Sequence, residues 1–213
     1  MENYSIKLKN KTAGIVGCGG LGCYVIEFLS RLNIGKLKII DEDVFKESNL
    51  NRQLYSKYSN LGKYKVDVAK KRVAEKSATH VITVKDRLTK YNIDKFLKDI
   101  DVAVDCTDNI ESRFLLQEKC REHNIPLVHG AIDEMYGHVT TILPGDDTLH
   151  RIYHREKSMQ SKTVSFAPPL IASVEASETL KVLINSSDIL SKKVFYMNLE
   201  TNLFFVEDLS QEK

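Results

Sequence analysis

Short apolar runs alternate with amphipathic stretches over the first 130 residues of this chain. The runs at 13–16, 36–40, 81–84, 102–104 and 127–130 have the length and the aliphatic content of buried strands. Between them, apolar residues recur every three or four positions, as in helices that bury one face. Strands that alternate with helices predict an α/β fold of Rossmann-like form, with a largely parallel sheet and helices on both faces.

The pattern changes in the last third of the chain. Residues 138–143 have the pattern of an extended, antiparallel strand, and the polar, aperiodic stretch at 145–167 predicts a long loop that lies over the active site. After two prolines, an amphipathic helix is predicted at 173–184 and a hairpin at 194–206. We therefore expect a C-terminal antiparallel portion of the sheet.

Length and composition limit the class of protein. With 213 residues, of which 42% are hydrophobic, the chain is long enough for one globular domain with an ordinary core. Its net charge is only +2 and its basic residues are scattered among acids, so we expect no nucleic-acid partner. It has no run of eighteen apolar residues and no signal-peptide core at its start, so we expect no membrane association and a cytoplasmic location.

A glycine-rich turn after the first predicted strand indicates a nucleotide site. Gly17, Gly19, Gly20 and Gly22 lie between an apolar strand and a helical stretch, which is the context that the dinucleotide-binding fingerprint requires. Glycines there permit a tight turn, the approach of backbone to phosphate, and close packing of helix on strand. Asp41 ends the next strand, nineteen residues after Gly22, where a carboxylate can accept hydrogen bonds from ribose hydroxyls.

Two cations follow Asp41 and favour a triphosphate over a dinucleotide. Arg52 lies in the donor-rich loop 48–53, and Lys65 follows thirteen residues later. A triphosphate carries more charge than loop amides and a helix dipole neutralise, so converging cations suit ATP. A nicotinamide-dependent oxidoreductase is the alternative that the glycine turn alone would allow, but it leaves these cations without a role.

The segment 105–109 predicts a magnesium site. It follows an apolar strand directly and precedes a helix, so its carboxylates should project from the carboxyl edge of the sheet. Mg²⁺ is usually held by one or two carboxylates together with phosphate oxygens. We therefore predict that Asp108 binds Mg²⁺.

In this order and spacing, the motifs from Gly14 to Asn109 resemble those of the ThiF/MoeB/HesA family of adenylating enzymes, the bacterial relatives of ubiquitin-activating enzymes. The resemblance covers residues 12–143 well and 165–206 loosely. It implies a single adenylation domain over 1–213, with a nucleotide-binding core at 12–131 and a carrier-facing crossover and C-terminal portion at 132–213.

The resemblance also implies a function and a set of site residues. The substrates would be ATP and the C-terminal glycine carboxylate of a small ubiquitin-like sulfur carrier, in thiamine, molybdopterin or natural-product synthesis, and the enzyme would be a homodimer. Asp41 would hold the ribose, and Asp108 the Mg²⁺. The implied phosphate-binding and cofactor-binding side chains are Asn49, Arg52, Gln53, Lys65 and Asn109, and the catalytic set is Arg52, Lys65 and Asp108.

The chemistry of adenylation agrees with these residues without the resemblance. An ionised carboxylate is already a nucleophile, so the enzyme has only to align the reactants and neutralise oxygens that gain charge. No cysteine is needed, and the four cysteines contain no C-x-x-C pair, so we expect neither a disulfide scaffold nor a four-cysteine zinc site.

The chain also departs from the family pattern. About twelve residues precede the first strand and no arginine occurs before Arg31, so a partner's arginine in the ATP site would be missing or otherwise supplied. His150 and His154 lack a third ligand at zinc spacing, so no zinc is expected. The segment 163–165 contains no cysteine for a covalent link to the carrier, which predicts that the reaction stops at the adenylate. A weakly active or regulatory nucleotide-binding subunit is therefore a second alternative.

Overall fold

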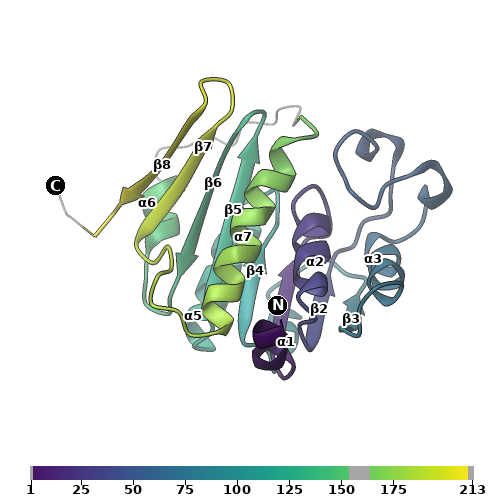
Figure 1. Ribbon diagram of the computed structural model, residues 1–213, viewed down its shortest axis with the longest axis horizontal. Coiled ribbons are helices and arrows are strands. Elements are labelled where there is room, and N and C mark those ends of the chain that lie inside the picture. Colours follow the sequence, from purple (N-terminus) through teal and green to yellow (C-terminus); the bar gives the residue numbers. More distant parts are fainter. Residues whose placement is uncertain (1, 154–163, 211–213) are drawn as a thin grey trace.

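The computed structural model describes residues 2–153 and 164–210, with one mixed sheet flanked by helices (Figure 1). The strands are β1 (Thr12–Val16), β2 (Lys36–Ile40), β3 (His80–Val84), β4 (Val102–Asp105), β5 (Leu127–Asp133), β6 (Tyr136–Ile142), β7 (Lys193–Asn198) and β8 (Leu203–Asp208). The helices are α1 (Glu2–Leu8), α2 (Gly22–Arg31), α3 (Lys65–Ala74), α4 (Ile93–Leu97), α5 (Ile110–Glu122), α6 (Thr148–Tyr153) and α7 (Ala167–Leu183), with short 3-10 turns η1 (Glu47–Asn49) and η2 (Tyr58–Asn60).

The sheet confirms the predicted fold class. Its order is β3-β2-β1-β4-β5-β6-β7-β8; the first five strands are parallel, and β5 to β8 pair antiparallel. The chain leaves β1 toward β2 and returns on the other side at β4. Ligands bind at such a switch point in open α/β sheets, outside the carboxyl ends of the strands.

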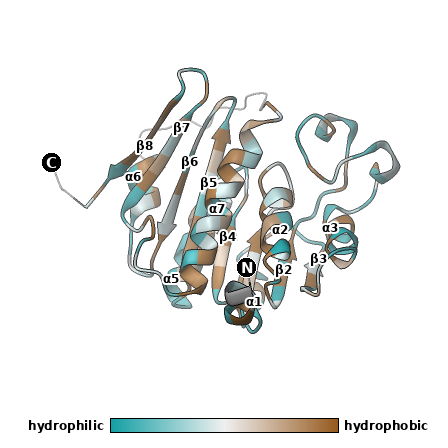
Figure 2. Cartoon of the chain, in the orientation of Figure 1, coloured by the Kyte–Doolittle hydropathy of each residue, from teal (hydrophilic) through white to brown (hydrophobic). Residues whose placement is uncertain are grey.

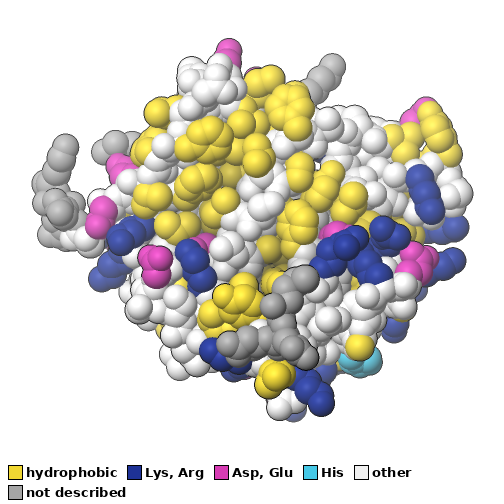
Figure 3. Space-filling view, in the orientation of Figure 1, with side chains coloured by type: hydrophobic (Ala, Val, Ile, Leu, Met, Phe, Trp, Pro, Cys, Tyr) yellow, Lys and Arg dark blue, Asp and Glu magenta, His cyan; other side chains and the backbone are white. Residues whose placement is uncertain are grey.

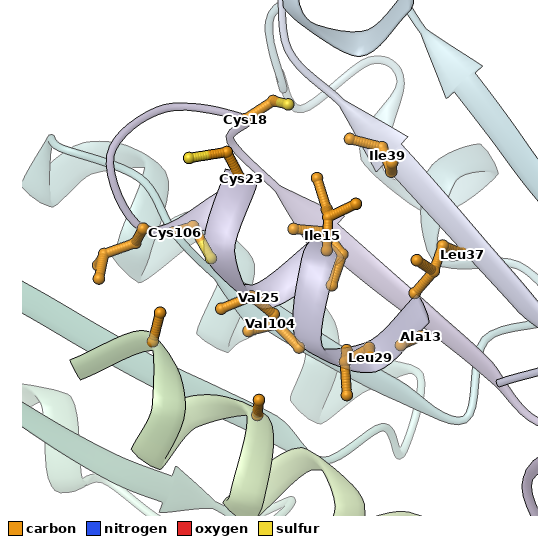
Figure 4. Packing of buried hydrophobic residues seen from close by; sticks show 14 of the residues in the cluster. Ala13, Ile15, Cys18, Cys23, Val25, Leu29, Leu37, Ile39, Val104 and Cys106 are labelled. Carbon is orange, nitrogen blue, oxygen red and sulfur yellow. The ribbon is translucent and has the colours of Figure 1, made fainter. Parts of the chain in front are cut away.

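The two faces of the sheet bury separate apolar clusters. On the face seen in Figure 1, α2 and α7 lie side by side, and Val25 and Leu29, one turn apart on α2, pack with Ile15 and Val104 of the central strands (Figure 4). On the opposite face, α4, α5 and α6 cover a second cluster that includes Phe96. Because β1 and β4 are buried on both faces, their sequences are apolar without alternation, and in Figure 2 the hydrophilic colours lie mainly on helix surfaces and loops.

Two predictions about local structure were wrong. The segment 145–167 is not a loop throughout, because α6 occupies 148–153; the carboxylate of Asp146 accepts hydrogen bonds from the amide and hydroxyl of Thr148 and starts this helix. Residues 154–163, predicted to lie over the active site, are outside the described residues. Helix α7 begins at Ala167, before the two prolines. Proline is tolerated in the first turn of a helix because the amides of that turn have no acceptor within the helix.

Helix α1 was not predicted. Asn92 directly precedes α4, and its side chain bonds nearby backbone and does not cap the helix. The terminal hairpin of β7 and β8 is confirmed. Among the described residues, no helix combines the length and the hydropathy that a membrane crossing requires.

Candidate functional site

Three segments meet at the carboxyl edge of the sheet, around the switch point between β1 and β4. The glycine turn 17–22 follows β1, Asp41 follows β2, and the segment 106–109 follows β4. Because β1 lies between β2 and β4, the turn has Asp41 on one side and the 106–109 segment on the other. Sequence order and parallel pairing therefore bring together the segments that the motifs singled out.

The four glycines of the turn serve two different purposes. Gly17 has a φ of +95°, and a Cβ there would lie 2.6 Å from the carbonyl oxygen of Cys106. At Gly22 a Cβ would lie 2.0 Å from the carbonyl oxygen of Gly17, so the fold itself requires both glycines. At Gly19 and Gly20 the nearest atoms would be 3.6 and 3.9 Å away, which is ordinary contact. The protein alone does not require glycine at these two positions, whereas a phosphate lying against the backbone would.

Asp41 is held rigidly at the rim of this turn. Its Oδ2 accepts a hydrogen bond from the amide of Cys18 at 2.6 Å, and its Oδ1 accepts one from the amide of Asp43 at 2.7 Å. Partial burial raises the pKa of Asp41, while the positive charge of Lys65 and the two amides oppose that rise. Each carboxylate oxygen can accept a further hydrogen bond, which suits a pair of ribose hydroxyls.

The loop after Asp41 brings Arg52 and Gln53 against the turn. A Cβ at Gly20 would lie 3.9 Å from Nε of Arg52, and one at Gly19 would lie 3.6 Å from Nε2 of Gln53. The Oε1 atom of Gln53 is buried without a hydrogen-bond partner among the described residues. An unpartnered buried acceptor is costly, so a ligand with a donor group fits this place.

Asn49 has a local role in the same loop. Its Oδ1 accepts a hydrogen bond from the amide of Lys46 at 2.9 Å, and its own carbonyl accepts one from the amide of Gln53. Asn49 thus shapes the loop that presents Arg52 and Gln53. The structure does not bring its side-chain oxygen to the glycine turn.

Lys65, the first residue of α3, is buried and forms an ion pair with the exposed Asp43. Its Nζ lies 2.7 Å from Oδ2 of Asp43, and its side chain is 6% exposed while that of Asp43 is 52% exposed. The Lys65 ammonium also acts electrostatically on Asp41, so it lies close to the ribose side of the site. In this structure the charge of Lys65 is neutralised by Asp43, and a phosphate would compete with that carboxylate.

The segment after β4 corrects one prediction. Asp105 does not project from the edge, because it is buried on the face covered by α5 and α6, where its Oδ2 lies 2.8 Å from Nδ1 of His129. Asp108 is exposed and has no hydrogen bond or ion pair with the residues that the structure describes. Asn109 caps α5, since its side chain accepts a hydrogen bond from the amide of Ser112 at 2.9 Å.

Several polar residues beneath this edge were missed at the sequence level. The half-buried Arg113 and Tyr153 and the buried His138 join Asp105 and His129 in one hydrogen-bond network. Burial lowers the pKa of His129, against the effect of Asp105, and lowers that of His138 still further. Burial would raise the pKa of Asp105, but the hydrogen bond from His129, together with other groups, outweighs burial and lowers it, so the pair contains an ionised carboxylate and a neutral imidazole.

The cysteines are buried free thiols. Burial raises the pKa of Cys23 and of Cys120 to about 12, and raises those of Cys18 and Cys106 well above the usual value. Thiols in such surroundings stay protonated at neutral pH and are poor nucleophiles. Within 2–153 and 164–210 no three His, Cys, Asp or Glu side chains are grouped to hold a metal ion; His154 lies outside these ranges.

Comparison with known proteins gives one consistent result. The sequence profile described as the ThiF family matches residues 2–213. The chain is 31% identical over 199 residues to the SAMP-activating enzyme E1 of Haloferax volcanii, covering 89% of this chain and 73% of that protein. It is 28% identical over 208 residues to a probable molybdopterin-synthase adenylyltransferase of Porphyra purpurea, covering 93% of this chain but only 54% of that protein.

The fold has close structural neighbours. The crystal structure of E. coli MccB with ATP superposes with a TM-score of 0.84 at 21% identity, covering 98% of this chain and 67% of MccB. At this identity the superposition concerns the fold alone. It includes the antiparallel strands as well as the parallel ones, because nearly the whole chain is covered.

Proposed function

Because this chain belongs to the ThiF family, we propose that it is an adenylyltransferase that transfers AMP from ATP to the C-terminal glycine carboxylate of a small ubiquitin-like sulfur carrier. The relatives support this substrate class, since one is named as activating SAMP and another as a molybdopterin-synthase adenylyltransferase. In the proposed reaction a carboxylate oxygen bonds to the α-phosphorus, the bond from that phosphorus to the bridging oxygen breaks, and pyrophosphate leaves.

The observation that carries the proposal is the open backbone at Gly19 and Gly20 with Arg52 and Gln53 beside it. Backbone amides and a guanidinium neutralise and orient phosphate oxygens, and a preorganised set of donors stabilises the charge that develops during transfer. The donor set therefore fits a triphosphate better than a neutral ligand.

We assign Asp41, Lys65 and Asp108 to the remaining tasks. Asp41 would accept hydrogen bonds from the ribose, and Lys65 would exchange Asp43 for a phosphate oxygen when ATP binds. Asp108 is an exposed carboxylate at the sheet edge, which is the chemistry expected of a Mg²⁺ ligand. Bound Mg²⁺ would neutralise the charge of the phosphate oxygens.

No side chain of the site has to act as a nucleophile or a base. An ionised carboxylate attacks without losing a proton, and the buried thiols nearest the turn, Cys18 and Cys106, remain protonated. The proposed reaction therefore ends at the acyl adenylate, and sulfur transfer would be the work of another protein.

An apolar surface supports a protein substrate. Hydrophobic side chains gather on the upper part of the face in Figure 3, and the exposed residues include Phe166 directly before α7, Leu170 of α7, and Phe204 and Val206 of β8. Exposed apolar patches of this kind often mark protein–protein contacts. We assign this surface to contact with the carrier or with a second copy of the chain, and we retain a homodimer as part of the proposal.

Thermal unfolding with different nucleotides tests the first step. We expect ATP with Mg²⁺ to raise the melting temperature and NAD to leave it unchanged. Exchange of labelled pyrophosphate into ATP then tests the second step, and it should require a carrier with an intact C-terminal glycine. A carrier that ends in a C-terminal amide is the matched control, since it cannot attack. Stabilisation by NAD alone would contradict the proposal, and ATP binding without carrier-dependent exchange would favour a regulatory subunit.

A further inference from the structure

A partly buried hydrogen-bond network lies directly beneath the segment that carries Asp108. We propose that Arg113 and Tyr153 are positioning residues, which hold the 106–109 segment in the geometry that Mg²⁺ and ATP require. The inference concerns residues outside the nucleotide-binding set, and its functional part rests on the function proposed above.

The first part of the network fixes the residue next to Asp108. Nη2 of Arg113 donates to the carbonyl oxygen of Thr107 at 3.0 Å. The amide and the hydroxyl of Thr107 both donate to Oδ1 of Asp105, at 2.9 and 2.7 Å. Thr107 is therefore held on both sides, by a guanidinium and by a carboxylate, which leaves Asp108 exposed at a defined place.

The second part joins this segment to α6. Nη1 of Arg113 donates to the hydroxyl of Tyr153, whose ring centroid lies 5.1 Å from the guanidinium carbon. The same hydroxyl lies 2.9 Å from Nε2 of His129 and 3.2 Å from Nε2 of His138. Tyr153 thus contacts three polar groups from α5, β5 and β6.

The proton positions follow from the charges. Since Asp105 is ionised and His129 is neutral, Nδ1 of His129 donates to Asp105 and its Nε2 accepts. The hydroxyl of Tyr153 then donates to Nε2 of His129, and its oxygen accepts from Arg113 and from Nε2 of His138. The Tyr153 hydroxyl and Nε2 of both histidines therefore have compatible partners.

Together these bonds close a ring that runs Asp105, Thr107, Arg113, Tyr153, His129 and back to Asp105. Removing the Tyr153 hydroxyl opens the ring, while the aromatic contact of Tyr153 with Phe114 can remain. Losing the Tyr153 hydroxyl would leave Arg113 with a further unpartnered nitrogen, because its Nε is already buried without a hydrogen-bond partner among the described residues. An opened ring should loosen the carbonyl of Thr107 and with it the position of Asp108.

The test compares Tyr153→Phe with Thr141→Val. The control also removes a buried hydroxyl from a polar partner, in this case Glu178, but on the face covered by α7. In ligand-free protein, hydrogen–deuterium exchange of peptides covering 106–112 should become about 3- to 10-fold faster in Tyr153→Phe, the range for one lost hydrogen bond. The control should exchange these amides at the wild-type rate.

Calorimetry of ATP binding supplies the functional readout. We expect Tyr153→Phe to bind ATP without metal as the wild type does, while the gain in affinity from Mg²⁺ falls by about 3- to 10-fold. If Tyr153→Phe does not fold, Arg113→Lys is the second variant, because one ammonium cannot bridge both Thr107 and Tyr153. It should give the same two changes.

Unchanged exchange of the 106–112 peptides would overturn the inference, even if the variant melts at a lower temperature. An equal loss of ATP affinity with and without Mg²⁺ would also overturn it, since that is the sign of a general structural defect. A wild-type protein whose ATP binding does not respond to Mg²⁺ would contradict the proposed function, and the exchange measurement would still decide whether the ring holds the segment.

Discussion

Replacing Gly20 by alanine should weaken ATP binding without weakening the fold. A Cβ at this position would have its nearest neighbours, Nε of Arg52 and Cγ of Pro168, at 3.9 Å, so it meets no clash. The φ of Gly20 lies outside the left-handed region, so alanine can adopt the same backbone conformation. The added methyl group would instead occupy the space in which a phosphate oxygen would lie against the turn.

The two effects differ in sign and in size. Alanine restricts the unfolded chain more than glycine does, so the free energy of unfolding should stay constant or rise by about 0.4–1 kcal/mol. Loss of a charge-assisted hydrogen bond between backbone and phosphate costs about 1.5–3 kcal/mol, which corresponds to about a 10- to 150-fold weaker affinity for ATP.

Gly22→Ala is the matched comparison within the same turn. Its Cβ would lie 2.0 Å from the carbonyl oxygen of Gly17, and this contact cannot be relieved without moving the backbone of the turn. We expect a loss of about 3 kcal/mol in the free energy of unfolding, at the upper end of the cost of overpacking.

Urea unfolding and calorimetry with ATP measure the two quantities separately. If Gly20→Ala binds ATP as tightly as the wild type, the phosphates do not approach this turn and the proposed site is wrong. If Gly22→Ala is as stable as the wild type, the assignment of that glycine to the fold is wrong.

Four further predictions concern the site and the core. Asp108→Asn should lose pyrophosphate exchange while melting as the wild type does, since an exposed metal ligand adds little to stability; normal exchange would exclude the assignment. Arg52→Ala and Lys65→Ala should each cost about 2–4 kcal/mol of transition-state stabilisation, measured as kcat/KM, and wild-type values would show that these charges are not used. Burial raises the pKa of Glu175 well above its usual range, so the free energy of unfolding should fall as the pH rises from the unfolded pKa toward the folded one. Urea titrations at pH 5 to 8 should show this fall in the wild type and not in Glu175→Gln. An equal dependence of stability on pH in both proteins would count against the burial argument. A variant with all four cysteines replaced by Ser or Ala should still form the acyl adenylate, and a folded, ATP-binding variant that releases no pyrophosphate would reveal an unrecognised nucleophile.

The features predicted correctly depend on neighbours in sequence. The strand at 36–40 was predicted at its observed bounds, and Gly22 is required because a Cβ there would meet the carbonyl oxygen of Gly17 in the same turn, as the motif implies. Arg52 and Gln53 reach the turn because parallel strands β1 and β2 end at the same edge, so a loop after β2 must begin beside it. Such placements follow from the parallel pairing of strands, which the alternation of predicted strands and helices indicates.

The prediction for Asp105 was wrong because it needed side-chain direction and register. Successive residues of a strand point to opposite faces, so Asp105 and Cys106 lie on different sides of the sheet. Asp105 pairs in register with His129, and the helices on that face then bury both. The sequence 105–109 contains two aspartates, and nothing in it distinguishes the buried one from the exposed one.

The sequence by itself determined the fold class and the segments that meet around the glycine turn, because hydrophobic periodicity and the alternation of strands and helices depend on contacts over a few residues. Tertiary structure decided which polar residues are available to a ligand. It buries Asp105 and pairs Lys65 with Asp43. It also closes the ring through Arg113 and Tyr153, forty positions apart. These contacts join distant segments through the packing of α5 and α6 on one face, and no local pattern in the chain encodes that packing.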